Sequence, residues 1–389
     1  MSLLSTIIIS SGIWRAVLFT PGGELPFQLK IEEQKGNYSF TIINGKEHMQ
    51  LGEVTLKNDS VIVQFPVYES ELRLKINSAQ HLEGVFNNLT RLTHASIRLD
   101  AKFTDQPRFP LKSAAPPKSV AGKWSVTFSP DTKDSSAAVG VFEQNKNLVT
   151  GTFLTTSGDY RFLEGVVDGD SLFLSSFDGV FVYLFKAQVT DNKLVGVFYS
   201  GTHRQITWSG FSDPSASLPD ASTLTTIKDG ENGFYFRFPD LDSIMVSIDD
   251  PSFKNKIVIV QILGSWCPNC LDESAFLADY YDKNKLKGFE IVGLSFEKTD
   301  DFKRAVGNVT RFRNRLNINY KLLISANRDK LKATLPGIEN FMGFPTTIFL
   351  DKNHKVRKVH AGFNGPATGA EYENFKDDFY SFMNKLLSE

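Results

Sequence analysis

The sequence has very little cysteine: only Cys267 and Cys270 occur among its 389 residues. This excludes a disulfide-rich scaffold, because that class needs several cysteine pairs. Net charge is almost absent as well, since 43 basic and 44 acidic residues leave a formal charge of −1. Such a balance creates no global field that would gather nucleic acid or an anionic membrane, so we expect no nucleic-acid partner.

Long apolar runs are also missing. No stretch approaches the roughly 18 apolar residues that a membrane helix needs, so we expect no membrane span in this chain. The start, MSLLSTIIIS, has a short apolar stretch but no basic segment and no clear cleavage site, and we do not interpret it as a signal peptide. The composition is otherwise that of a globular protein, and its length predicts two or three domains.

Short alternating apolar runs, broken by Gly, Asn and Asp, dominate residues 1–213. NYSFTII and SVIVQFPV are examples, and the pair Asn44-Gly45 is typical of a hairpin turn. Helical periodicity is nearly absent from this half. The pattern predicts an antiparallel β sandwich or barrel.

Three pairs of segments in this half resemble each other at a nearly constant offset of about 110 residues, which suggests an internal repeat. Chance similarity between β-rich segments is the alternative. A proline-containing stretch, FTDQPRFPLKSAAPPKS, separates the copies and is typical of a linker. We therefore expect β repeats at 1–106 and 118–213, either separate or joined in one domain. The matching pairs are 11–19 with 121–129, 51–65 with 163–177, and 82–86 with 194–198.

A second linker, SDPSASLPDASTL, precedes a different pattern. KNKIVIVQILG is a continuous apolar run of the kind that forms a central strand covered on both faces. Strands then alternate with amphipathic helices, which indicates a layered α/β domain over 225–389. The whole chain is thus predicted to be a multidomain α+β protein.

The two cysteines form a Cys-x-x-Cys pair in SWCPNCLDE. A structural zinc site would need two further ligands, and the chain offers no other cysteine and no histidine pair at typical spacing. A structural disulfide would close too short a loop to stabilise the fold much. Redox exchange is the remaining interpretation.

The surroundings of the pair favour that chemistry. A buried strand leads into Cys267, and a helix begins at Pro268, whose missing N–H costs nothing there. Free backbone N–H groups and the positive end of the helix dipole favour a thiolate at Cys267, the expected nucleophile. Cys270 follows one turn later and is placed to resolve a mixed disulfide. Trp266 is expected to flank the thiol, or simply to pack.

Residues 225–389 resemble the thioredoxin fold, and more closely the TlpA/ResA-like family of thiol-disulfide oxidoreductases. KNKIVIVQILGSWCPNCLDE, GFEIVGLSFE and FMGFPTTIFLDKNHKV carry the resemblance. It implies a cis peptide bond before Pro345, opposite the cysteines, with Phe344 and Thr346 beside it. Backbone there would pair with an extended substrate segment, so these three residues and Trp266 are candidate substrate-binding residues. The resemblance implies a redox-active disulfide, with no other cofactor and no metal.

In the same family pattern, Glu273 lies beneath the cysteines and handles protons, and Glu297 is a second candidate for that role. A buried carboxyl group could accept the proton of Cys270; an ordinary solvated helix glutamate is the alternative for Glu273. Two positions depart from the pattern. Gln261 stands where thioredoxins have a buried aspartate, and Ser274 stands where a proline is usual.

We therefore expect a thiol-disulfide oxidoreductase that reduces or exchanges disulfides of protein or peptide substrates, with electrons supplied by another redox protein. The resemblance implies a periplasmic or cell-envelope location in bacteria. A peroxidase is one alternative, but Gly264 occupies the place where peroxiredoxins have threonine. A binding or tethering protein is the other, although the histidines of the β region, His48, His81, His94 and His203, are scattered.

Overall fold

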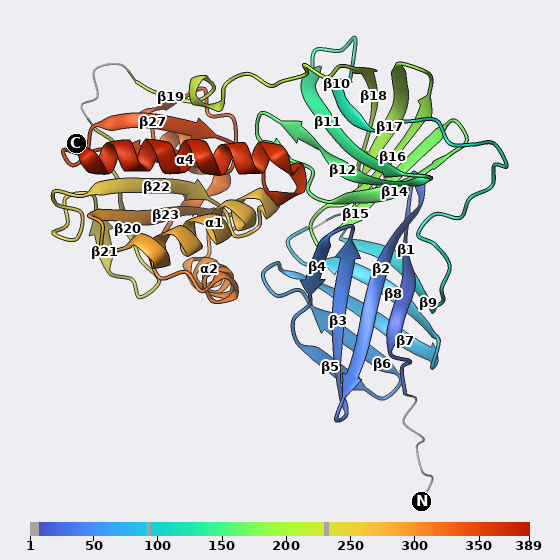
Figure 1. The fold of residues 1–389 in the computed structure, drawn as a ribbon. Coiled ribbons are helices and arrows are strands. Elements are labelled where there is room, and N and C mark those ends of the chain that lie inside the picture. The colour runs from blue at the N-terminus through green and yellow to red at the C-terminus, as the bar shows by residue number, and fades with distance from the viewer. Residues whose placement is uncertain (1–7, 92, 94, 229–232) are drawn as a thin grey trace, which may run out of the picture. The chain divides into compact units, whose positions relative to one another are not determined.

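The computed structural model describes residues 8–91, 93, 95–228 and 233–389 (Figure 1). The chain divides into two compact units, the first made of Met1–Phe153 and Phe162–Ser217 and the second of Leu154–Arg161 and Leu218–Glu389. Most of the N-terminal apolar stretch discussed above lies outside the described residues. No helix in the described part of the chain has the length and apolar character that crossing a bilayer requires.

The first unit begins with an antiparallel sheet of nine strands in the order β4-β3-β2-β1-β9-β8-β7-β6-β5. Consecutive strands are neighbours except β4 and β5, which stand at the two ends of this order, and β9 returns to pair with β1. The predicted hairpin turn at Asn44-Gly45 joins β3 to β4, and Gly45 has a φ of 55°, a conformation that glycine adopts without strain. The strands are β1 (Gly12–Thr20), β2 (Gly23–Gln34), β3 (Asn37–Asn44), β4 (Glu47–Gln50), β5 (Val54–Lys57), β6 (Ser60–Gln64), β7 (Ser70–Ser78), β8 (His81–Asn88) and β9 (Ser96–Phe103).

A second sheet closes into an eight-stranded barrel, because β11 pairs with both β10 and β12. The sequence-based expectation of a β sandwich or barrel is thus confirmed. The short strand β13 extends the sheet beyond β12 without joining the barrel. The strands are β10 (Gly122–Phe128), β11 (Ser136–Asn145), β12 (Leu148–Thr155), β13 (Gly158–Asp159), β14 (Leu163–Asp168), β15 (Ser171–Phe177), β16 (Val182–Val189), β17 (Lys193–Ser200) and β18 (Arg204–Ser212).

The two sheets share local details. Trp14 in β1 and Trp124 in β10 are both buried, and each indole N–H donates to the backbone oxygen four residues earlier. Each of these strands pairs with the next strand in sequence and with the last strand of its sheet. Both tryptophans therefore sit at the point where the sheet returns on itself.

The second unit is built on a five-stranded sheet in the order β24-β23-β22-β26-β27, in which β22, β23 and β24 are parallel and the others antiparallel. Short elements surround it: β19 (Thr226–Ile227) pairs with β25 (Ile338–Glu339), and β20 (Arg237–Pro239) with β21 (Met245–Ser247). The main elements are β22 (Ile257–Leu263), α1 (Pro268–Asn284), β23 (Phe289–Glu297), α2 (Phe302–Leu316), β24 (Lys321–Asn327), α3 (Leu331–Thr334), β26 (Thr346–Leu350), β27 (Val356–Ala361) and α4 (Ala370–Ser388), with 3₁₀ turns η1 (Ala221–Thr223), η2 (Arg328–Lys330) and η3 (Pro366–Thr368).

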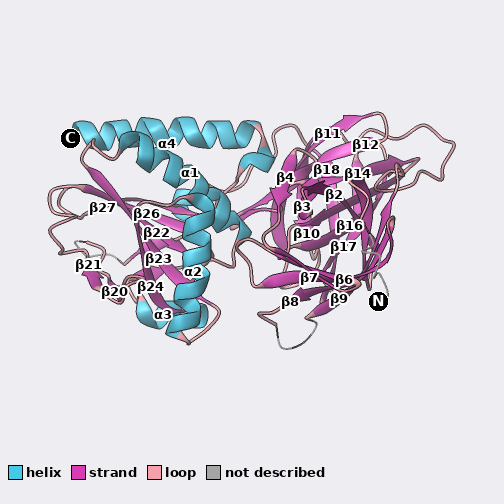
Figure 2. Cartoon of the chain, turned by 90° about the horizontal axis from the view of Figure 1, so that it is seen from below, coloured by secondary structure: helices cyan, strands magenta, loops and turns pink. Residues whose placement is uncertain are grey.

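The central strand β22 is buried along its whole length, as its unbroken apolar run predicts. Val258, Val260 and Ile262 point into a hydrophobic cluster that includes Phe236 and Phe253. The opposite face is covered by helices, which Figure 2 shows alongside the sheet. Because side chains alternate along a strand, Gln261 points to this helical face and reaches α1.

Helices α1 and α4 pack on each other through aromatic side chains. The ring centroids of Phe276 and Phe379 are 4.8 Å apart, and those of Tyr280 and Phe379 are 4.9 Å apart, both in edge-to-face geometry. This packing fixes α1, which contains Cys270 and has Cys267 as its N-cap residue, against the body of the unit.

Candidate active site

Cys267 is the N-cap residue of α1, and Pro268 occupies the first helical position. The Cys267 sulfur accepts a hydrogen bond from the backbone N–H of Cys270, with N and Sγ 3.3 Å apart. Cys267 is 6% exposed and Cys270 is completely buried. Cys267 is therefore the more accessible of the two cysteines, and its role as the attacking nucleophile stays a prediction.

The predicted proline loop lies beside this sulfur. The Phe344–Pro345 peptide bond is cis, as the family resemblance implied. The Cys267 thiol donates to the carbonyl oxygen of Phe344, with Sγ and O 3.6 Å apart. Thr346 is buried and its hydroxyl donates to the Gly343 carbonyl, so its side chain holds the turn and does not face solvent.

Trp266 is held rigidly next to the cysteines. Its indole N–H donates to the Phe296 carbonyl at 2.9 Å, and its ring meets that of Phe344 edge-on at 5.3 Å. Lys298 and Arg328 each place a cation over the indole, at 4.5 and 4.7 Å from the ring centroid. Both the flanking and the packing interpretation of Trp266 agree with this geometry.

Glu273 lies beneath the cysteines in a closed polar network. Its carboxylate accepts hydrogen bonds from the Gln261 side-chain amide at 2.7 Å and from the Thr347 hydroxyl at 2.8 Å. The Ser274 hydroxyl donates to the other end of the Gln261 amide at 2.9 Å. The two residues that depart from the family pattern, Gln261 and Ser274, are thus hydrogen-bonded to each other.

Burial dominates the electrostatics of this network. Loss of solvent raises the pKa of Glu273 from 4.5 to about 7, against the opposing effect of its two hydrogen bonds. Burial also raises the pKa of the Cys270 thiol well above its usual value, and the Cys267 sulfur and the Glu273 charge add to the effect. The raised pKa keeps Cys270 as a neutral thiol unless a nearby base accepts its proton, whereas Glu273 can gain or lose a proton near neutral pH.

Glu297 is buried as well, but its oxygens are occupied. They accept hydrogen bonds from the backbone and side chain of Ser265 at 2.9 and 2.8 Å, and from the Ser295 hydroxyl at 2.8 Å. Ser265 is two residues before Cys267. The geometry favours an anchor for this loop, and proton handling by Glu297 stays a prediction.

Gly264 has no room for a side chain. A Cβ atom built there would lie 2.3 Å from the indole nitrogen of Trp266. A threonine of the peroxiredoxin kind would therefore displace Trp266.

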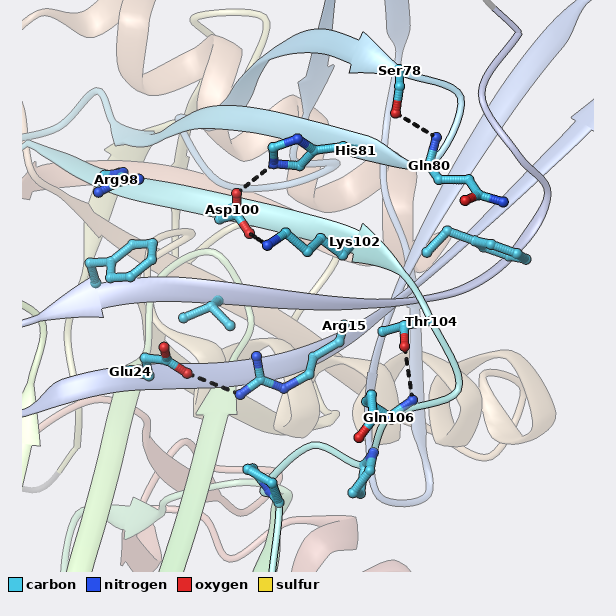
Figure 3. A pocket seen from close by; sticks show the side chains of 15 residues that line it. Arg15, Glu24, Ser78, Gln80, His81, Arg98, Asp100, Lys102, Thr104 and Gln106 are labelled. Carbon is cyan, nitrogen blue, oxygen red and sulfur yellow. Dashed lines mark hydrogen bonds and ion pairs between the residues drawn. The ribbon is translucent and has the colours of Figure 1, made fainter.

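The first unit contains a separate pocket of about 810 Å³, formed over β1, β8 and β9 (Figure 3). His81, Glu83 and Asp100 bring ligand atoms within 4.8 Å of one another, the one such cluster found among the described residues, and neither cysteine belongs to it. However, the His81 ring already bonds to Asp100 at 2.7 Å, and the Lys102 ammonium lies 3.8 Å from the same carboxylate. A cation so close competes with a metal ion. In the sequence His81 is one of several scattered histidines, whereas in the structure it pairs with Asp100. His94 lies outside the described residues.

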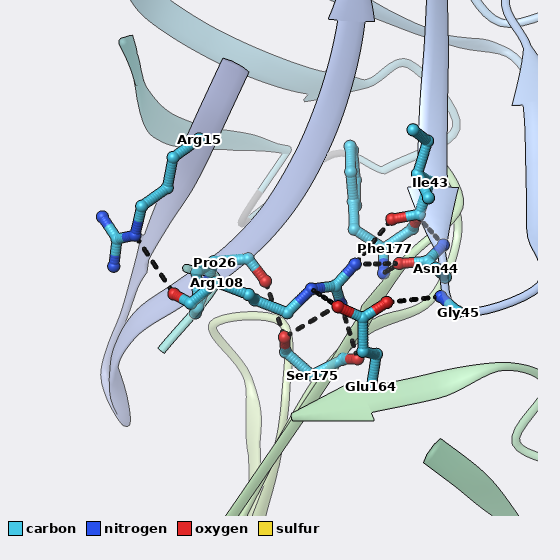
Figure 4. Close-up of polar contacts among 9 residues, drawn as sticks. All are labelled: Arg15, Pro26, Ile43, Asn44, Gly45, Arg108, Glu164, Ser175 and Phe177. Atoms are coloured by element: carbon cyan, nitrogen blue, oxygen red, sulfur yellow. Dashed lines mark hydrogen bonds and ion pairs between the residues drawn. The ribbon is translucent and has the colours of Figure 1, made fainter. Parts of the chain in front are cut away.

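The stretch predicted as a linker contains a buried charge that the sequence pattern did not reveal (Figure 4). Arg108 is 4% exposed, and its guanidinium donates to the carbonyl oxygens of Ile43 at 2.5 Å and Ser175 at 3.2 Å. Its Nε lies 3.4 Å from a carboxylate oxygen of Glu164. Arg108 thereby joins the first sheet to the barrel.

Comparisons with known proteins agree with the geometry of the second unit. The family model described as Redoxin matches residues 215–375. This segment is a Redoxin domain. Thioredoxin-like proteins of this kind normally work through a redox-active disulfide and need no external cofactor.

Relatives of the domain include the thiol-disulfide oxidoreductase ResA of Bacillus thuringiensis subsp. konkukian (strain 97-27), 28% identical over 127 residues, which are 33% of this chain and 66% of the relative. The thiol:disulfide interchange protein DsbE of Vibrio cholerae serotype O1 is 23% identical over 170 residues, 44% of this chain and 82% of the relative. A solved structure of a putative DsbE from Chlorobium tepidum aligns with a TM-score of 0.32 and 20% identity, covering 40% of this chain and 98% of that one.

Proposed function

We propose that the protein reduces or exchanges disulfides of protein substrates through the Cys267/Cys270 dithiol. The observation that supports this most is the position of the Cys267 sulfur. It lies at the N-terminus of α1, accepts the Cys270 N–H, and stands 3.6 Å from the carbonyl of Phe344, next to Pro345. A nucleophile, a second thiol one turn away and a backbone edge for an extended peptide therefore meet at one point.

In the proposed reaction, the Cys267 thiolate attacks one sulfur of a substrate disulfide. That disulfide breaks, a mixed disulfide forms, and the departing substrate thiolate takes up a proton. Cys270 then loses its proton and attacks the Cys267 sulfur, which releases the second substrate thiolate. Two electrons pass to the substrate, and a Cys267–Cys270 disulfide remains for an upstream redox protein to reduce.

Glu273 is the proposed acceptor of the Cys270 proton. Both groups are buried, the charge of Glu273 acts on Cys270, and the carboxyl titrates near neutral pH. For substrate binding, we propose the backbone beside Pro345 together with the rings of Trp266 and Phe344. Thr346 contributes through its backbone, because its side chain is buried.

The test uses the full chain and its two serine variants. Cys267→Ser should abolish reduction of insulin disulfides, because the attacking sulfur is gone. Cys270→Ser should accumulate mixed disulfides with substrate, because the resolving sulfur is gone. Parent-like turnover by both variants would contradict the proposal.

The alternative of a binding protein draws on the pocket of the first unit. Arg15, Arg98 and Lys102 stand there beside the exposed rings of Phe19 and Phe103. The substrate choice of the Arg98→Ala variant tests whether the β region takes part in recognition. If the variant changes which protein disulfides are reduced, the β region recognises substrate. A peroxidase is the weaker candidate because Gly264 leaves no space for threonine.

We propose a periplasmic or cell-envelope location in bacteria, as the family resemblance implies; relatives named thiol-disulfide oxidoreductase ResA and thiol:disulfide interchange protein DsbE support that resemblance. We also propose that the two β sheets are copies of one unit, 1–106 and 118–213, with 225–389 as the redox domain. The matching tryptophan hydrogen bonds and the common strand order support the repeat.

A further inference from the structure

A hairpin from the β half of the sequence belongs to the second unit. Within Leu154–Arg161, residue 154 pairs with 159 and residue 155 with 158. Gly158 packs so closely on Asn269, between the two cysteines, that an added Cβ would lie 1.8 Å from the Asn269 amide nitrogen. Ser157 borders Gly343, and the carbonyl of Thr156 borders Gly362. The hairpin therefore contacts the inter-cysteine segment and the proline loop.

Two charged side chains of this hairpin are buried, one against the start of η3 and the other against the first turns of α1. Asp159 is 2% exposed and accepts the backbone N–H of Gly365 at 2.5 Å. Arg161 is 5% exposed, and its guanidinium donates to the carbonyl oxygen of Pro268 at 3.1 Å. The same nitrogen lies 3.3 Å from a carboxylate oxygen of Asp272, whose side chain is 14% exposed.

We propose that Arg161 is a positioning residue of the redox centre, and that the Arg161–Asp272 pair sets the equilibrium between the dithiol and disulfide forms of the cysteines. The inference rests on the proposed function and adds the element that tunes it. Pro268 is bonded directly to Cys267, so the guanidinium that holds its carbonyl fixes the first turn of α1. A charge buried there acts on the sulfur with little solvent screening.

The sign of the effect follows from which form carries charge. Two molecules of glutathione reduce the Cys267–Cys270 disulfide, giving glutathione disulfide and the two cysteine thiols. Only the reduced form can carry a negative sulfur, so a nearby cation stabilises the dithiol form and a nearby anion stabilises the disulfide form. Three other buried carboxyl groups among the described residues, Asp159, Glu273 and Glu297, lie in or near the redox centre and are unchanged in the variants below.

The experiment measures the oxidised fraction of the full chain in glutathione buffers at pH 7. Arg161→Met should favour the disulfide about tenfold, which lowers the reduction potential by about 30 mV. Asp272→Asn should favour the dithiol about tenfold, a shift of about 30 mV in the opposite direction. The double variant should lie between them, and Arg161→Lys should stay within about threefold of the parent because the charge is kept.

Opposite shifts distinguish electrostatic tuning from loosening of the helix, which would move both single variants the same way. Asp279→Asn is the matched control, since Asp279 lies on the same helix in an exposed pair with Lys283 and should cause no shift. Shifts of the same sign in the two single variants would overturn the inference. So would the absence of any shift in these variants when the parent does exchange disulfides. If Arg161→Met fails to fold, the absence of a shift in Asp272→Asn overturns it alone. A parent that forms no Cys267–Cys270 disulfide refutes the proposed function, and this inference with it.

Discussion

Glu273→Gln should change how the stability of the second unit depends on pH. Glutamine has the shape of the neutral carboxyl group and can keep both hydrogen bonds, accepting from Gln261 and donating to the Thr347 hydroxyl. Unlike glutamate, it carries no charge to bury. The variant therefore isolates the free energy of ionising a carboxyl group at this position.

The magnitude follows from the two pKa values of Glu273, 4.5 when unfolded and about 7 when folded. Below pH 4.5 both states hold the proton and the group contributes nothing. Between these values the folded state binds more protons, so the free energy of unfolding falls as pH rises. Above pH 7 the loss is constant at about 3 kcal/mol, since one pH unit corresponds to about 1.4 kcal/mol. The variant should therefore gain about 3 kcal/mol over the parent between pH 4.5 and pH 8.

The two cysteines provide an assay for this unit alone, because both are buried in it and the chain has no others. Reduced protein is equilibrated in urea at each pH, then labelled in a brief pulse at one common pH, and the fraction modified at Cys270 is measured by mass spectrometry. Glu339→Gln, a change at an exposed glutamate of the same unit, should give a curve parallel to that of the parent. Parallel curves for Glu273→Gln as well would refute the reasoning.

Three further predictions concern packing and buried charge. Gly264→Ala should destabilise the second unit by about 1–3 kcal/mol and alter the Trp266 environment, because the added Cβ clashes with the indole. Gly307→Ala, in open space on α2, should instead stabilise the unit by about 0.5–1 kcal/mol. Thiol labelling in urea compares the two variants, and equal effects would contradict the clash at Gly264. Arg108→Met should lower the free energy of unfolding of the first unit by about 3–5 kcal/mol, because Glu164 and two carbonyl oxygens lose their partner. Lys46→Met, in an exposed pair with Glu143, should lower it by less than about 1 kcal/mol. Urea denaturation followed by tryptophan fluorescence measures both variants, and similar losses of stability would show that Arg108 does not anchor the two sheets. Ser265→Ala should cost about 1.5–3 kcal/mol by removing a donor from the buried carboxylate of Glu297, and unchanged stability would mean that this carboxylate does not anchor the loop.

The parts of the fold that sequence predicts well depend on local patterns. Strand β22 and helix α1 were predictable because an unbroken apolar run and a Pro at the first helical position lie within a few residues of each other. Thr347 was missed, although the alternation of side chains along β26 would have placed it on the face opposite Thr346, towards Glu273.

Buried charges in loops could not be predicted in this way. Arg108 lies in a proline-containing stretch, and Arg161 follows a short turn, so each has the local sequence of an exposed residue. Their burial depends on distant partners: the Pro268 carbonyl that Arg161 contacts is 107 residues further along the chain. No local pattern contains that information, because the desolvation of a cation is offset only by groups that folding brings to it.

Gln261 and Ser274, by contrast, act on Glu273 through a direct hydrogen bond to each other. The Gln261 carbonyl accepts the Ser274 hydroxyl at 2.9 Å, so its amide nitrogen is directed at Glu273 as a permanent donor. An amide cannot reverse its role, whereas the Thr347 hydroxyl can donate or accept. When Glu273 takes up a proton, that proton must therefore reside on Oε1, the oxygen that faces Thr347. Two residues that depart from the family pattern thus leave one defined position for the proton beneath the cysteines.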